Sequence, residues 1–212
     1  MLDNHYDVIC TDLDGTLLDD QQRHYHCYLA ILEKYGGVPV SADQYWNEKR
    51  HGKNRKELLV ESQFGGTYED YMQCWKDWIE EDTFLLYETL KPGVIPALRI
   101  LRSKTDRFLL VTMRQKKTQL LKQLRHLELD IFFDEIIAGN PFVRKKSSLV
   151  SFPPSTKCLV IGDTEADEEL ANQLDADFLA VTSGLRDPSF FQSPDYTVSD
   201  WSSDFTICRN SS

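Results

Sequence analysis

Four short apolar runs, each followed by small or polar residues, most constrain how this chain can fold. They are Tyr6–Thr11, Arg107–Thr112, Lys157–Ile161 and Asp177–Val181. Longer amphipathic stretches lie between them, and in Val94–Ser103 the apolar residues recur at the i, i+3, i+4 and i+7 spacing of a helix. Short buried strands that alternate with helices are typical of βαβ units. The chain is therefore predicted to be an α/β protein with a Rossmann-like parallel sheet flanked by helices.

The segment between the first two runs has a different character. It contains Trp46, Trp75 and Trp78 and many tyrosines, but little that is typical of a buried strand. Tyr28–Tyr35 and Tyr68–Glu81 are predicted to be helices with wide aromatic faces. The dipeptide at 92–93, Pro-Gly, marks the return to the α/β pattern. We expect an α/β core domain of residues 1–19 and 89–212, with an inserted α-helical cap domain of residues 20–88.

Charge and composition argue against several classes of protein. The chain has 212 residues and a formal net charge of −10, with no basic stripe, so we expect no nucleic-acid partner. Neither a membrane-spanning run nor a signal peptide is recognisable, so we expect no membrane association. The five cysteines are scattered, without a Cys-x-x-Cys pair, which favours free thiols. These features predict a cytoplasmic protein. We expect it to be a monomer or a homodimer.

Two carboxylates directly follow the first apolar run. They are Asp12 and Asp14, separated by one leucine and followed by a glycine. Residues i and i+2 of an extended chain point the same way, so both carboxylates should be aimed at one point. Open parallel sheets bind ligands at the carboxyl ends of their strands. The residues that follow the other runs should therefore gather at the same edge: Thr112, Asp163, Asp167 and the basic pair Lys145 and Lys146.

These segments, in this order, resemble the four motifs of the haloacid dehalogenase superfamily, whose commonest members are phosphatases. The sequence Asp-Leu-Asp-Gly-Thr-Leu at 12–17 resembles the first motif, and Leu-Val-Thr at 110–112 the second. Lys145 or Lys146 fits the third, and Gly-Asp-x-x-x-Asp at 162–167 resembles the fourth. The resemblance covers the whole chain, because the helical insert lies where this family has its C1 cap. The stretch 112–139 is similar to phosphoglycolate-phosphatase relatives.

The resemblance implies a phosphatase that acts through an aspartyl-phosphate intermediate. Asp12 would attack phosphorus, and Asp14 would protonate the leaving alkoxide and later activate water. Thr112 would donate a hydrogen bond to a phosphoryl oxygen. Lys145 or Lys146 would offset the negative charge, and helical spacing towards the following apolar residues slightly favours Lys146.

The same acidic residues are the expected ligands of Mg²⁺, which prefers oxygen donors. Asp12, the backbone carbonyl of Asp14, and Asp163 would bind the ion, and Asp167 would be a further ligand or an anchor behind the ligands. Two simpler interpretations stay open at this point. Asp163 could cap the helix that begins near Thr164, and Asp167 could be a solvated acid in the first turn of that helix.

One departure from the family pattern concerns the substrate. Met113 and Arg114 follow Thr112, where many relatives have Asn or Ser. A thioether cannot donate a hydrogen bond, but the Met113 N–H could, and Arg114 is expected to reach outward to the substrate. In the insert, a basic stretch either contacts the substrate or is a solvated turn. It consists of Arg50, His51, Gly52, Lys53 and Arg55.

The expected partner is a small phosphorylated metabolite of the phosphoglycolate or sugar-phosphate type. Two alternatives remain. A phosphomutase of the β-phosphoglucomutase type would use the same aspartyl-phosphate, and a non-catalytic binding protein could have the same fold. A dehalogenase is disfavoured, because Asp14 supplies an acid and base that such an enzyme does not need.

Overall fold

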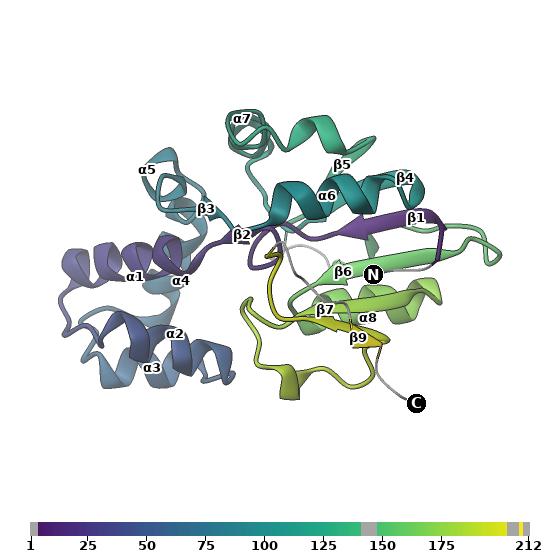
Figure 1. Ribbon diagram of the computed structural model, residues 1–212. Helices are drawn as coiled ribbons and strands as arrows, with labels where there is room; N and C mark the ends of the chain where they lie inside the picture. The colour runs from purple at the N-terminus through teal and green to yellow at the C-terminus, as the bar shows by residue number, and fades with distance from the viewer. Residues whose placement is uncertain (1–3, 141–147, 203–207, 210–212) are drawn as a thin grey trace. The chain divides into compact units, whose positions relative to one another are not determined.

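The protein is described here from a computed structural model, which covers residues 4–140, 148–202 and 208–209. Contacts along the chain divide it into two compact units. One unit is formed by Met1–Leu18 together with Leu90–Ser212, and the other by Asp19–Thr89. The chain passes twice between the two units, and at each passage the boundary differs by one residue from the domain boundary expected from the sequence. The first unit is an α/β unit and the second, apart from the strand ends at its borders, is helical (Figure 1).

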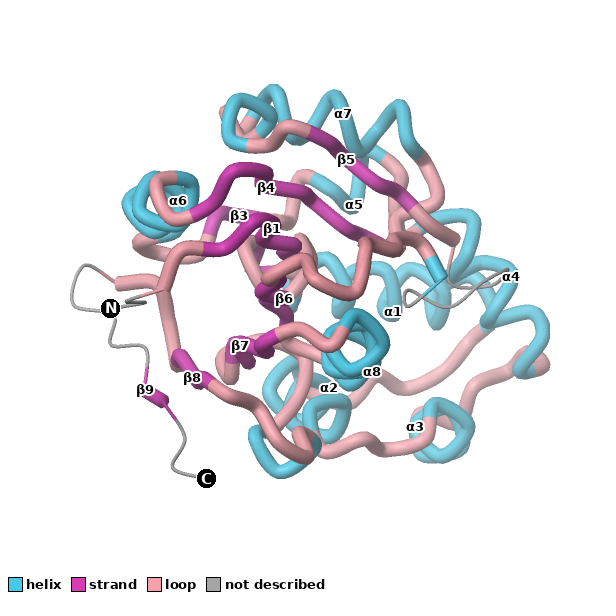
Figure 2. The backbone as a smooth tube through the Cα atoms, turned by 90° about the vertical axis from the view of Figure 1, so that its right-hand side faces the viewer, coloured by secondary structure: helices cyan, strands magenta, loops and turns pink. Residues whose placement is uncertain are grey.

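The α/β unit is built on a seven-stranded sheet in the order β5-β4-β1-β6-β7-β8-β9 (Figures 1 and 2). Neighbouring strands from β5 to β8 run parallel, and β9 is antiparallel to β8. The four apolar runs correspond to β1, β4, β6 and β7, so the predicted parallel α/β sheet is confirmed. The strands are β1 (Tyr6–Thr11), β4 (Thr105–Thr112), β5 (Glu135–Ala138), β6 (Cys158–Gly162), β7 (Asp177–Val181), β8 (Tyr196–Val198) and β9 (Cys208–Arg209).

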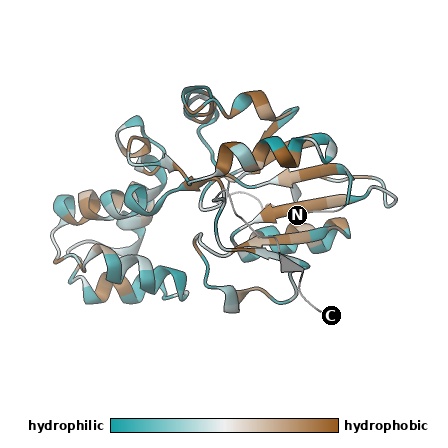
Figure 3. Cartoon of the chain, viewed as in Figure 1, coloured by the Kyte–Doolittle hydropathy of each residue, from teal (hydrophilic) through white to brown (hydrophobic). Residues whose placement is uncertain are grey.

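Both faces of the central strands of this sheet are buried. Ile9 of β1 packs in a cluster with α6 (Val94–Arg102) and α7 (Lys117–His126), whereas Val8 packs on the other side with α8 (Glu165–Leu174). In Figure 2, α6 and α8 lie on opposite sides of the strands. Strands covered on both faces need apolar residues at successive positions, which explains the continuous runs in the sequence and the brown strands of Figure 3. This unit also contains the short 3₁₀ segments η1 (Asp130–Phe132) and η3 (Pro188–Phe190).

The strand order reverses at β1. The chain goes from β1 to β4 and β5 on one side, then crosses to β6, β7 and β8 on the other. In the register of the sheet, Thr11 lies opposite Leu110 of β4 and Ile161 of β6. The residues that follow these three positions therefore emerge at one edge, at the place where α/β sheets bind ligands.

The helical unit has its own aromatic core. Tyr45 stacks on Tyr28, with 4.8 Å between ring centroids, and Trp75 stacks on Tyr71 at 5.8 Å. The two predicted helices belong to α1 and α4, but α1 begins earlier and α4 ends earlier than the sequence suggested. The helices are α1 (Gln21–Tyr35), α2 (Ala42–Arg50), α3 (Arg55–Glu61), α4 (Tyr68–Trp78) and α5 (Asp82–Leu85).

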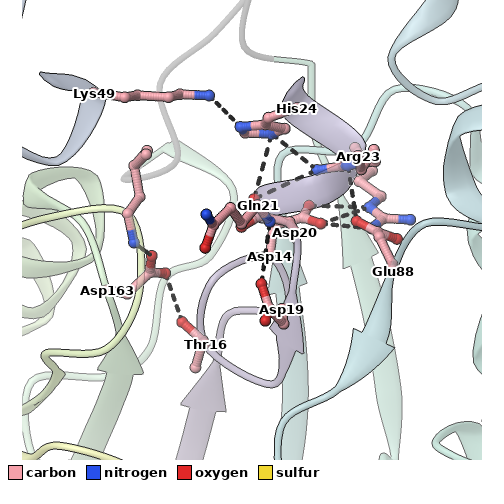
Figure 4. A network of polar contacts seen from close by, with 12 residues as sticks. Asp14, Thr16, Asp19, Asp20, Gln21, Arg23, His24, Lys49, Glu88 and Asp163 are labelled. Carbon is pink, nitrogen blue, oxygen red and sulfur yellow. Dashed lines mark hydrogen bonds and ion pairs between the residues drawn. The ribbon is translucent and has the colours of Figure 1, made fainter. Parts of the chain in front are cut away.

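A buried ion pair joins residues near the beginning and the end of the helical unit. Arg23 Nε lies 2.8 Å from Glu88 Oε1, and both side chains are at most 4% exposed (Figure 4). The adjoining strands β2 (Leu18–Asp19) and β3 (Thr89–Leu90) pair in a separate two-stranded sheet. This pairing keeps the two crossings between the units side by side. Among the described residues, no helix combines the length and the apolar character that crossing a membrane requires.

Candidate active site

Asp12 is held in the register of the sheet although it follows the last residue of β1. Its backbone N–H donates to the carbonyl of Ile161 in β6, at 2.9 Å. The next side chain, Leu13, is fully buried in the core of the α/β unit. Because successive side chains of an extended segment alternate, Asp12 and Asp14 are directed away from that core. Asp12 remains 8% exposed.

A tight turn after Asp14 brings a hydroxyl to the site. Gly15 has φ +73°, and a Cβ atom there would lie 2.1 Å from a carboxylate oxygen of Asp163. Both the left-handed backbone and the close approach therefore require glycine. The turn places Thr16 so that its hydroxyl donates to Asp163 Oδ1 at 2.8 Å, as Figure 4 shows.

Asp163, which follows β6, is fully buried and held on both oxygens. Besides Thr16, the backbone N–H of Leu185 donates to Oδ2 at 2.6 Å. Gly184, in the loop after β7, makes this approach possible, because a Cβ atom there would lie 2.2 Å from Oδ2. The N-cap residue of α8 is Thr164, so the simpler interpretation of Asp163 as that cap is wrong.

Asp167 is also fully buried, so it is not a solvated acid. It occupies the third position of α8, and its Oδ2 accepts from the backbone N–H and the hydroxyl of Thr164, at 3.0 and 2.6 Å. Gly162 leaves space for it, because a Cβ atom at that position would lie 2.1 Å from Asp167 Cγ. The carboxylate therefore caps its helix and, at the same time, belongs to the site.

The site is a cluster of three buried carboxylates. Asp12, Asp163 and Asp167 each offer an oxygen, and these three oxygens lie within 4.8 Å of one another. Buried like charges at this separation repel strongly unless a cation lies among them. An all-oxygen donor set of this kind fits a hard cation such as Mg²⁺. The side chain of Asp14 is not a member of this cluster.

Thr112 closes β4 at the same edge and is fully buried. Its carbonyl accepts a hydrogen bond from the N–H of Gly139 at 2.8 Å. Its hydroxyl finds no hydrogen-bond partner among the residues that the structure describes. A buried hydroxyl without a partner is unfavourable, so this group is suited to bind a ligand oxygen. The predicted lysines, Lys145 and Lys146, lie outside the described residues.

Arg114 does not reach outward, as the sequence had suggested. It is 2% exposed, and its Nε donates to both carboxylate oxygens of Asp14, at 3.2 and 3.0 Å. Its Nη1 donates to Gln123 Oε1 on α7. The partly buried carboxylate of Asp14 and the buried amide of Gln123 provide its partners instead. Met113, between them, is half-buried.

The basic stretch predicted to contact substrate lies in the helical unit, between α2 and α3. Lys53 Nζ forms ion pairs with Glu61 and, at 2.9 Å, with Glu48, and these carboxylates raise the pKa of Lys53. The guanidinium of Arg55 lies 4.9 Å from the ring centroid of Trp75. Both residues line a cavity of about 40 Å³ within this unit. The other members are Arg50 at the end of α2 and His51 and Gly52 in the following turn.

Several residues that build the site were not singled out from the sequence. Thr16 lies inside the first motif, and Gly184 and Leu185 follow the apolar run of β7, so collecting the residues after every run would have found them. Gln123 carries no such signal. Neither does Trp201, which is fully buried and donates from Nε1 to the carbonyl of Thr16 at 2.8 Å.

Comparison with known proteins gives concordant results. The family model of haloacid dehalogenase-like hydrolases matches residues 6–175. A phosphorylated-carbohydrates phosphatase from Thermotoga maritima is 26% identical over 63% of this chain and 62% of its own length, which is less than two thirds. A phosphoglycolate phosphatase from Rhodobacter capsulatus is 28% identical over 82% of this chain and 84% of its own length.

A solved structure has the same fold. It is a haloacid dehalogenase-like hydrolase from Streptococcus pneumoniae, with a TM-score of 0.71 and 20% identity, over 91% of this chain and 93% of that one. At this identity the likeness concerns the fold alone. The family model, in contrast, matches most of the chain, including Asp12, Thr112 and Asp163. The chain therefore belongs to the haloacid dehalogenase-like hydrolases.

Proposed function

We infer that this hydrolase is a Mg²⁺-dependent phosphatase that acts on small phosphomonoesters. The observation that carries this inference is the cluster of three buried carboxylates, Asp12, Asp163 and Asp167, at the edge where the strand order reverses. Such a cluster both needs a cation and contains a carboxylate that can act as a nucleophile. The partnerless hydroxyl of Thr112 at the same edge adds a donor for a phosphoryl oxygen.

Asp12 is the proposed nucleophile. One of its oxygens forms a bond to phosphorus while the bond from phosphorus to the ester oxygen breaks, which leaves an aspartyl-phosphate. Asp14 gives its proton to the departing alkoxide. It then takes a proton from the water that attacks phosphorus and releases phosphate from Asp12. The Thr112 hydroxyl would donate to a phosphoryl oxygen throughout.

The proposed metal ligands are Asp12, Asp163 and the backbone carbonyl of Asp14, with Asp167 as a further ligand or an anchor. A bound Mg²⁺ would neutralise the repulsion between the nucleophile and the phosphate oxygens. The protein's own part is to keep the carboxylates in place. Thr16 and Leu185 hold Asp163, and Thr164 holds Asp167.

For the substrate we propose the phosphoglycolate or sugar-phosphate class, with residues 20–88 as the cap that recognises the leaving group. The names of the Thermotoga and Rhodobacter relatives support this class. The basic stretch from Arg50 to Arg55 is the proposed contact. Lys53 and Arg55 already have partners in the helical unit, so an anionic substrate would have to compete with Glu48, Glu61 and the ring of Trp75.

Phosphate release from a panel of phosphorylated metabolites, measured with Mg²⁺ and with a chelator, tests the proposal. Asp12→Asn should abolish turnover, because the neutral amide is nearly isosteric but a poor nucleophile. Asp106→Asn is the matched control, since Asp106 is an exposed residue near the amino end of β4. Wild-type rates in Asp12→Asn would contradict the assignment. Isomerisation of a sugar phosphate without phosphate release would indicate a phosphomutase instead.

A further inference from the structure

Arg114 and Asp14 form a two-point contact that the general chemistry of the site does not require. Arg114 belongs to the loop between β4 and α7, and Asp14 follows β1, 100 residues earlier. The guanidinium Nε approaches both carboxylate oxygens, and Nη2 donates to Oδ1 as well. Two adjacent N–H groups on one carboxylate restrain its direction as well as its position.

The far side of the guanidinium is held too. Nη1 of Arg114 donates to the side-chain oxygen of Gln123, which is 9% exposed on α7. Gln123 is followed by Leu124, which is fully buried in the core of the α/β unit. The amide is thus carried by a helix that is packed in place. Arg114 therefore joins Asp14 rigidly to α7.

Asp14 is the most exposed carboxylate of the site. Its side chain is 23% exposed, whereas Asp163 and Asp167 are fully buried and hydrogen-bonded. A group that transfers a proton must lie within about 2.6–3.2 Å of the atom that gives or takes it. A partly exposed aspartate leaves this range when its side-chain torsions change, so a contact that fixes its direction favours the transfer.

We propose that Arg114 is a positioning residue, which directs the carboxylate of Asp14 towards the leaving-group oxygen, and that Gln123 holds Arg114 in place. The inference rests on the proposed function, because it assumes that Asp14 transfers the proton. This role differs from the one expected from the sequence, in which Arg114 itself binds the substrate. The two roles make different predictions, since a substrate-binding arginine would contribute to affinity whatever the leaving group.

Substrates with different leaving groups distinguish a positioning role of Arg114 from a substrate-binding role. An alkoxide departs only if it receives a proton, whereas p-nitrophenolate is stable enough to leave without one. Misdirecting Asp14 should therefore slow the cleavage of an alkyl phosphate far more than the first cleavage of p-nitrophenyl phosphate. The second half-reaction, attack of water on the phosphoenzyme, should slow for both esters, because it needs Asp14 as a base.

The experiment compares Arg114→Met with Arg125→Met, and Gln123→Leu with Gln119→Leu. Arg125 is exposed and Gln119 half-buried on the same helix, so each control makes the same chemical change without the contact. Steady-state turnover is measured with glycerol 2-phosphate. Release of p-nitrophenolate is followed from the first turnover by rapid mixing.

In Arg114→Met we expect kcat for glycerol 2-phosphate to fall on the order of 100-fold, the lower part of the range for proton-transfer catalysis. KM should change little. With p-nitrophenyl phosphate we expect a stoichiometric burst at nearly the wild-type rate, followed by slow turnover. Gln123→Leu should show the same pattern with smaller losses. Arg114→Lys should be intermediate, because an ammonium keeps the charge but not the planar pair of donors.

Three results would overturn the inference. One is a burst rate of p-nitrophenolate release that falls as much as the turnover of glycerol 2-phosphate. Another is a rise in KM at unchanged kcat, which would make Arg114 a substrate-binding residue. The third is a control variant as defective as its partner. If Arg114→Met does not fold, Gln123→Leu and Arg114→Lys provide the same test. A wild-type protein that releases phosphate from neither ester would contradict the proposed function itself, and the inference with it.

Discussion

Replacing Thr112 by valine should make the protein more stable and less active. The two side chains have nearly the same shape, and valine suits the β4 strand at least as well as threonine. The backbone hydrogen bond from Gly139 to the Thr112 carbonyl does not involve the side chain and should persist. The substitution therefore removes one buried hydroxyl, for which no described residue provides a partner.

The size of both effects follows from that hydroxyl. Burying a hydroxyl without a hydrogen bond costs about 1–3 kcal/mol in proteins. From the lower end of that range, we expect the free energy of unfolding to rise by about 1 kcal/mol, and Tm by about 2–4 °C for a protein of this size. Loss of one donor to a phosphoryl oxygen should lower kcat on the order of 100-fold, as for other oxyanion donors.

Thr105→Val is the matched control. Thr105 is a buried residue of the same strand, but its hydroxyl donates to the carbonyl of Arg107 at 2.8 Å. Valine there should lower stability by about 1 kcal/mol, because a hydrogen bond is lost, and leave activity unchanged. Thermal unfolding and phosphate release are measured on both variants. If Thr112→Val loses stability as Thr105→Val does, or keeps full activity, the reasoning about the hydroxyl is wrong.

Two further substitutions test the surroundings of the site and the core of the helical unit. Gly184→Ala should push Asp163 away, because their contact must open from 2.2 to at least 3.0 Å, and should raise the Mg²⁺ concentration needed for half-maximal activity. An unchanged Mg²⁺ requirement in phosphate-release assays would contradict this. Burial raises the pKa of the Cys27 thiol to about 12. Above about pH 9 the unfolded thiol ionises first, so wild-type stability should fall relative to Cys27→Ala by about 1.4 kcal/mol per pH unit in urea denaturation. A pH-independent difference would contradict that cause.

The parts of the site that follow strands directly could be predicted from the sequence. Asp12 and Asp163 are polar residues at the end of buried apolar runs, and a parallel sheet necessarily brings such ends to one edge. Their surroundings could not be predicted in the same way. An arginine beside Thr112 has many possible partners, and only the fold shows that Asp14, 100 residues away, is the partner chosen.

Distant partners also explain why the start of α1 could not be predicted from the sequence. Its first turn, from Gln21, is polar and gives no amphipathic signal, so the helix was predicted only from Tyr28. In the structure Arg23 is buried because Glu88, at the other end of the helical unit, neutralises it. Patterns along the chain report which side chains avoid water. They do not report polar groups that are buried because a distant residue satisfies them.

The hydrogen bond from Trp201 to Thr16 joins two residues that are synthesised at very different times. A ribosome that adds roughly 5–20 residues per second needs about ten to forty seconds to make the 185 residues between them. Throughout that interval the turn after Asp14 lacks this anchor, and for most of it Asp163 and Asp167 do not yet exist. A nascent chain cannot assemble the acidic cluster early. The first residues of the site to be synthesised are among the last to be held in place.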